Sequence, residues 1–153
     1  MANIELSIVG SEKLTDIFGY WPSFHDAEVL ELHCLRGDVR PEKHLYTFPS
    51  LTWKTHLWKL TKEIDDKGFF VLAHHTLATL RFSDVSEFEM EGFNHQNAMM
   101  SLSIDRREER RGPSQFVLAV TIEPAFGMGA RFECTGIEVV EAIPCTPEGQ
   151  LLS

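Results

Sequence analysis

A histidine and an aspartate stand next to each other at His25 and Asp26, directly after an aromatic-rich turn. An aspartate that orients a histidine is how proteins build a general base or a metal ligand. In an extended segment, however, adjacent side chains point to opposite faces, so these two are poorly placed to bond each other. We therefore interpret His25 and Asp26 as scaffold residues that hydrogen-bond nearby backbone.

The other residues with catalytic or metal-binding chemistry form no known pattern. The 7 histidines include no helical i, i+4 pair, and H-E-x-x-H, C-x-x-C and G-x-S-x-G motifs are absent. The 3 cysteines, of which Cys34 and Cys134 alternate with apolar residues, are expected to be reduced thiols, and these two to be core residues. We expect no metal, no cofactor and no enzymatic activity.

An acidic stripe is the most distinctive charged segment of the chain. A strand over Val85–Met90, preceded by Asp84, would place Glu87, Glu89 and Glu91 on one face, with Phe88 and Met90 on the other. Like charges at this spacing repel, so they add nothing to the stability of the strand. Two interpretations stay open: a solvated face that protects the strand from aggregation, or an anionic patch for a basic protein partner.

A polar cluster follows the stripe at Asn94, His95, Gln96 and Asn97. Such side chains satisfy the backbone groups of a wide turn. The cluster could equally pack beside the corner formed by Trp21 to Asp26. The sequence does not distinguish these two roles.

Composition and charge limit the classes of partner that the chain can bind. The chain has 153 residues and a net charge of −9, a field that repels phosphate backbones and therefore excludes nucleic acid as a partner. The acidity either serves solubility or steers the chain toward a basic protein. The N-terminus is acidic and lacks the apolar run of a signal peptide, so we expect a cytoplasmic protein without a membrane segment.

The elements that would position these residues are mostly strands. We predict a strand at Ile4–Val9 and one short helix to Phe18, capped by Ser11 and stopped by Gly19. From Leu51 onward the apolar residues alternate with period two and turn signals recur, which is typical of antiparallel strands. We therefore predict a mainly β, single-domain fold over residues 1–153, with an ordered core at about 4–144. The antiparallel sheet is folded as a sandwich or half-barrel, with one N-terminal helix.

Local patterns give further expectations. The stretch from Gly37 to Pro49 is expected to be an irregular loop, and the charged run from Asp105 to Pro113 an exposed hairpin tip. In the strand from Ala98, we expect the even-numbered residues Met100, Leu102 and Ile104 to share a face opposite Met99.

Three segments together resemble a known family, immunity protein 50. They are Phe18–Glu28 with its Trp-Pro-Ser-Phe-His-Asp run, Leu80–Val85, and Glu91–Asn97 with its Gly-Phe-Asn turn. The matching positions, read as scaffold that fixes the core, are Trp21, Phe24, His25, Asp26, Phe93, Asn94 and Asn97. The resemblance covers most of the chain, from about Phe18 to Ile143.

The resemblance implies a bacterial cytoplasmic protein, mostly β, that belongs to a polymorphic toxin system and inhibits a cognate toxin by binding it. It implies no catalytic residues. On this interpretation the candidate toxin-binding residues are Asp84, Glu87, Glu89 and Glu91, and the toxin is basic. Two alternatives remain: a small-ligand-binding β-barrel, or an enzyme built on one, and an oligomerisation module with exposed Trp53, Trp58 or Met99.

Overall fold

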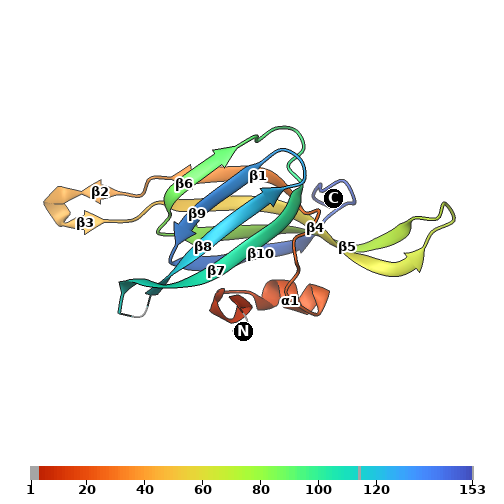
Figure 1. The fold of residues 1–153 in the computed structure, drawn as a ribbon, viewed down its shortest axis with the longest axis horizontal. Coiled ribbons are helices and arrows are strands. Elements are labelled where there is room, and N and C mark those ends of the chain that lie inside the picture. The colour runs from red at the N-terminus through yellow and green to blue at the C-terminus, as the bar shows by residue number, and fades with distance from the viewer. Residues whose placement is uncertain (1–3, 114, 153) are drawn as a thin grey trace.

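Two antiparallel four-stranded sheets form the body of the protein in a computed structural model, which describes residues 4–113 and 115–152 (Figure 1). The first sheet has the order β1-β4-β5-β10 and the second the order β6-β9-β8-β7. Their bounds are β1 Glu28–Leu35, β4 Ser50–Ile64, β5 Phe70–Ser83, β10 Gly136–Pro144, β6 Ser86–Glu91, β9 Gly129–Cys134, β8 Gln115–Pro124 and β7 Met99–Gly112. The sheets lie face to face, so the predicted mainly β fold with antiparallel pairing is confirmed in its sandwich form.

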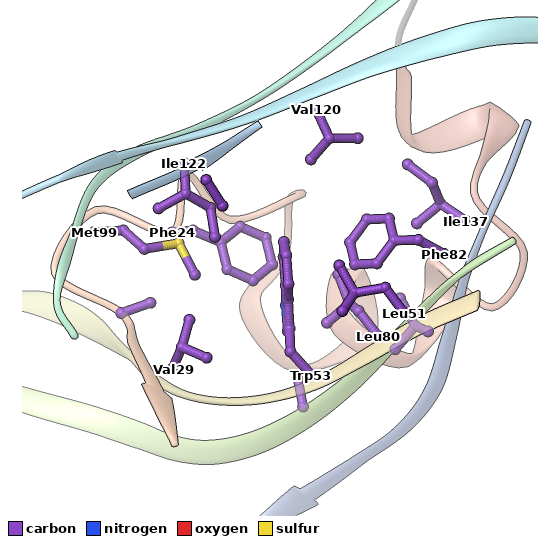
Figure 2. Close-up of a cluster of buried hydrophobic side chains, with 14 of the residues drawn as sticks. Phe24, Val29, Leu51, Trp53, Leu80, Phe82, Met99, Val120, Ile122 and Ile137 are labelled. Carbon is purple, nitrogen blue, oxygen red and sulfur yellow. The ribbon is translucent and has the colours of Figure 1, made fainter. Parts of the chain in front are cut away.

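One core joins the two sheets. Trp53 and Phe82 come from the first sheet and Phe132 from the second, with ring centroids 4.4 to 6.1 Å apart. Figure 2 shows Val120 and Ile122 of β8 pointing toward Trp53, Leu51 and Leu80 across the space between the sheets. All of these side chains are less than 5% exposed. The interior is therefore filled by interlocking apolar side chains, whose burial is the main stabilising contribution.

The N-terminal segment lies along β10. Helix α1 spans Glu12–Phe18 and buries Leu14 and Phe18, which confirms the predicted helix and its stop at Gly19, a left-handed residue with φ 84°. The Ser11 side chain makes no capping hydrogen bond. The predicted first strand is wrong: Ile4–Ser7 is a 3₁₀-helix (η1), and only Val9 bridges to Glu138.

Two hairpin arms project from opposite ends of the sandwich (Figure 1). The expected irregular loop holds one of them, made of β2 Val39–Arg40, the 3₁₀ turn η2 Pro41–Lys43 and β3 Leu45–Tyr46. The other is the far half of the β4–β5 hairpin, from Leu60 to Leu72. Its turn is fixed by the Asp65 side chain, which accepts hydrogen bonds from the backbone N–H groups of Lys67 and Phe69, both at 2.9 Å.

Bulges overturn two predictions of which residues face inward. The β7–β8 register shifts between Met99 and Ser101, so Met99 is fully buried and Met100 is 47% exposed, the reverse of the expected alternation. In β1 the register shifts between Val29 and Glu31, and Cys34 is exposed rather than in the core, whereas Cys134 is buried as predicted. Single-residue insertions of this kind leave no clear mark in an apolar pattern.

The prediction of an exposed oligomerisation patch at Trp53, Trp58 or Met99 is also wrong for two of these three residues. Trp53 and Met99 are 0% exposed and belong to the core, and only Trp58 reaches the surface in part. Trp53 and Met99 are therefore excluded from any self-association surface.

Replacing Thr55 by valine is expected to stabilise the fold. The Thr55 hydroxyl is fully buried and has no hydrogen-bond partner among the described residues, and such a group costs about 1–3 kcal/mol relative to an apolar isostere. Thr55→Val should therefore raise the free energy of unfolding in urea by about 1 kcal/mol. Thr52→Val, on the outward face of the same strand, is the control and should change it little. A loss of stability in Thr55→Val would show that the hydroxyl is bonded in solution.

Candidate partner-binding face

The polar cluster has both of the roles left open by the sequence: its side chains bond the backbone of the turn, and it packs beside the aromatic corner. The backbone N–H groups of Asp26 and Val29 donate to the carbonyls of Met99 and Asn97, at 2.8 and 3.1 Å, and the Met99 N–H donates back to Ala27. The corner and the turn after β6 thus form one paired end of the sandwich.

Asn97 is the centre of this end. Its side chain is buried, and its Oδ1 accepts hydrogen bonds from the backbone N–H groups of Asn94 (2.9 Å) and Met128 (3.2 Å). Its Nδ2 donates to the carbonyls of Val29 (3.2 Å) and Asn94 (2.8 Å). An amide offers two donors and a carbonyl oxygen. Asn97 therefore uses both ends of its amide to tie three separate segments together.

His25 contacts the backbone of another segment, and its distance to Asp26 is longer than a hydrogen bond. Its Nδ1 lies 2.9 Å from the Met100 carbonyl, and its Nε2 lies 3.6 Å from the Asp26 carboxylate, with both side chains more than half exposed. His25 thus contacts backbone, although the Met100 carbonyl lies across the corner and not in the adjacent turn. The expectation that the His25 and Asp26 side chains are poorly placed to meet is wrong, because the backbone is not extended at Asp26. Phe24 and Asp26 have φ of 63° and 68°, in the left-handed region, so the corner is held by its contacts and not by backbone preference.

The remaining motif residues divide between core and surface. Phe24 is 3% exposed and packs its ring 5.6 Å from that of Trp21. Asn94 closes the turn through its Oδ1, which accepts from the Gln96 N–H at 2.8 Å. Phe93, however, is 46% exposed and is not part of the core.

The acidic stripe is less uniform than the sequence indicates. The pairing of β6 with β9 shifts between Ser86 and Glu89, and Glu87 has a left-handed φ of 54°. Glu89 and Glu91 lie opposite Arg131 and Gly129, on the outer face of the second sheet. The Glu89 carboxylate accepts a hydrogen bond from Arg131 Nε at 2.6 Å, which lowers the pKa of Glu89. Glu89 is thus held in an exposed ion pair.

Asp84 supports the far end of the second sheet. Its carboxylate lies 3.2 Å from Arg111 Nη1, and the same guanidinium donates to the Asp84 carbonyl at 2.7 Å and to Ser86 Oγ.

The arginine run of β7 contacts neighbouring side chains. Arg107 and Arg111 both approach Glu133, at 3.5 and 3.6 Å. The Arg106 and Arg110 guanidinium groups each lie 4.3 Å from the ring centroid of Phe116. The arginine run is therefore exposed as predicted, but it lies within β7 and its charges are engaged locally.

An open depression of about 800 Å³ lies on the outer face of the second sheet. Its floor contains small residues, such as Gly129 and Thr121, and its acidic lining comes from Glu89, Glu91 and Glu123. No ion pair joins Glu87, Glu91 or Glu123 to another residue within 4–113 and 115–152. Glu123, which the sequence interpretation missed because it belongs to a different strand, completes this acidic surface.

A second polar cluster lies on the outer face of the first sheet. His56 Nε2 and His75 Nδ1 are 3.0 Å apart, so one of these nitrogens donates to the other. The C-terminal turn covers His56, with Gly149 so close that an added Cβ would lie 3.0 Å from His56 Nδ1. Burial lowers the pKa of His56, the His75 ring lowers it further, and Glu148 raises it.

The described residues contain no group of three or more His, Cys, Asp or Glu side chains placed to hold a metal ion. Burial raises the pKa of Cys134 to about 12, so this thiol is not a thiolate at neutral pH. None of the helices that the structure describes is long and apolar enough to cross a membrane.

A comparison with family models gives one match: the family described as immunity protein 50 matches residues 10–144. The match includes α1 and both sheets and ends where β10 ends, before the turn that covers His56. No curated protein and no solved structure matches the chain.

Replacing Asn97 by alanine is expected to cost about 3 kcal/mol, because the change leaves buried backbone groups of three segments without partners. Urea denaturation measures the loss, and the exposed neighbour His95→Ala is the matched control. A loss below about 1 kcal/mol would mean that water replaces these hydrogen bonds easily.

Acid is expected to weaken the fold through His56. Folding lowers the pKa of His56 below the value of about 6.5 that it has in the unfolded chain. The stability that depends on neutral His56 is therefore fully present above about pH 6.5 and is lost as the pH falls below it. The free energy of unfolding should therefore fall between neutral pH and about pH 5, and His56→Gln should reduce this fall. His33→Gln, on an exposed ring, is the control. An unchanged pH dependence in His56→Gln would contradict the assignment.

Proposed function

The chain belongs to the immunity protein 50 family, and we propose that it binds a cognate protein toxin in the cytoplasm and neutralises it without catalysing a reaction. The family match over residues 10–144 carries this proposal, because it includes every strand of both sheets. A non-catalytic inhibitor needs only a surface that covers the toxin's active site or substrate groove.

We further propose that the toxin contacts the acidic outer face of the second sheet. The candidate residues Asp84, Glu87, Glu89 and Glu91 do not contribute equally, since Asp84 and Glu89 already hold arginines of this chain. Glu91 and Glu123, which line the depression, and Glu87 of the same strand as Glu91 have carboxylates that no ion pair within residues 4–113 and 115–152 engages. We propose that these carboxylates meet the basic partner. Opposite fields of this kind speed association and select the partner more than they add affinity.

The alternative of a ligand-binding barrel or an enzyme built on one has less support. The strands form two separate four-stranded sheets, joined at one end by the bridge between Glu28 and Ala98, and not a closed barrel. The space between the sheets is filled by Trp53, Phe82 and Phe132. The depression with convergent polar groups lies outside the sandwich and is open to solvent. It suits a large partner better than an enclosed small molecule.

Co-expression with the toxin domain encoded next to this gene tests the proposal directly. We expect the two proteins to co-purify and the cells to survive. A toxin that is folded and active, yet is neither bound nor neutralised, would refute the proposed function.

Charge reversal tests the acidic face. Glu87→Lys with Glu91→Lys is expected to slow association with the toxin about tenfold at low salt and to flatten its salt dependence. Glu42→Lys with Glu141→Lys carries the same charge change at exposed sites away from this face and is the control. Equal association rates for the two double variants would place the toxin elsewhere, even if the wild type still binds it.

A further inference from the structure

The arm between Leu60 and Leu72 carries apolar side chains on one face. Leu60 lies opposite Leu72 and Ile64 opposite Phe70, and residues directly opposite each other point to the same side. Phe70 and Leu72 are two positions apart in one strand, which also places them on one side. Leu60, Ile64, Phe70 and Leu72 therefore form one apolar strip along the arm.

The strip is open to solvent. Its four side chains are 62%, 63%, 55% and 40% exposed, and Phe69 at the turn is 68% exposed. The arm extends well beyond the sandwich, so neither the sheets nor α1 covers it (Figure 1). A two-stranded ribbon by itself is marginally stable in water, and a row of exposed apolar groups makes it more costly still. The arm therefore offers an apolar face to a partner.

We propose that this partner is a second copy of the chain, so that two arms pack strip against strip across a two-fold axis. Each strip consists of two cross-strand pairs, Leu60 with Leu72 and Ile64 with Phe70. The pair Ile64 with Phe70 is nearer the turn, and the pair Leu60 with Leu72 is nearer the sandwich. A two-fold rotation places the first pair of one arm on the second pair of the other arm, so the surface is complementary to itself. The result is a small face-to-face sandwich of two ribbons, about 10 Å apart.

The area of the strip approaches that of a specific dimer. Its four side chains expose about 450 Å² per copy at these exposed fractions, taking roughly 200 Å² for each whole residue. Two copies would bury about 900 Å² in total, close to the roughly 1,000 Å² at which specific interfaces begin. Contacts near the base of the arm, where Trp58 is partly exposed, would add to this area.

Charge opposes this contact less than it opposes contacts across most of the surface. The whole chain carries a net charge of −9, so two copies repel each other across most of their surfaces. Between Leu60 and Leu72, however, Lys62 and Lys67 nearly balance the acids Glu63, Asp65 and Asp66. The arm is thus an apolar and nearly neutral part of an acidic protein.

Sedimentation equilibrium tests the dimer on the full chain. The wild type at about 100 μM should have twice the chain mass of 17.4 kDa. Ile64→Asp with Phe70→Asp would bury carboxylates against Leu60 and Leu72 of the other copy. This variant should sediment as a monomer, with unchanged far-UV circular dichroism. The matched control, Leu45→Asp with Phe48→Asp, makes the same change at exposed residues of the β2–β3 arm and should remain a dimer.

A monomeric wild type at this concentration would overturn the proposal, as would a dimer that survives in the Ile64→Asp, Phe70→Asp variant. If that variant does not fold, thiol cross-linking in the folded chain provides a second test. In a Cys34→Ser background, which removes the exposed cysteine, Ile64→Cys should be joined between copies by a short bismaleimide and Tyr46→Cys should not. Equal cross-linking at both positions would also contradict the dimer.

Discussion

The hydrogen bonds of Asn97 are the constraint on which this end of the sandwich depends. A buried amide is tolerated only when its donors and acceptor are all used, and here they reach Val29 at the start of β1, Asn94 in the turn after β6 and Met128 before β9. Asn97 thus links the two sheets at this end, beside the backbone bridge between Glu28 and Ala98. The glycines around it follow from the same crowding, since a Cβ on Gly127 would lie 2.7 Å from Asn97 Oδ1.

This constraint also explains why the recognisable segments of the sequence are structural. The aromatic corner and the turn from Glu91 to Asn97 lie far apart in the chain, yet their backbones pair through Asp26, Val29 and Met99. His25 adds a contact to the carbonyl of Met100.

The sequence was sufficient to predict the class of fold, because alternation of apolar residues and frequent turn signals are properties of each strand alone. It was not sufficient where the backbone departs from alternation, as at Met99, Glu87 and Cys34, since a bulge is set by pairing with a distant strand. The candidate site was predicted only in part for the same reason. Glu123 lies in β8, and only the order of strands in the sheet brings it to the same depression as Glu91.

The apolar arm projects from one end of the sandwich, whereas Glu89 and Glu91 lie on the outer face of the second sheet (Figure 1). A partner bound along the arm therefore need not cover the acidic face. Self-association through the arm would leave one acidic face free on each copy, so a dimer would present two separate anionic surfaces. The fold thus separates an apolar contact, whose strength depends on buried area, from a charged one, which governs rate and selectivity.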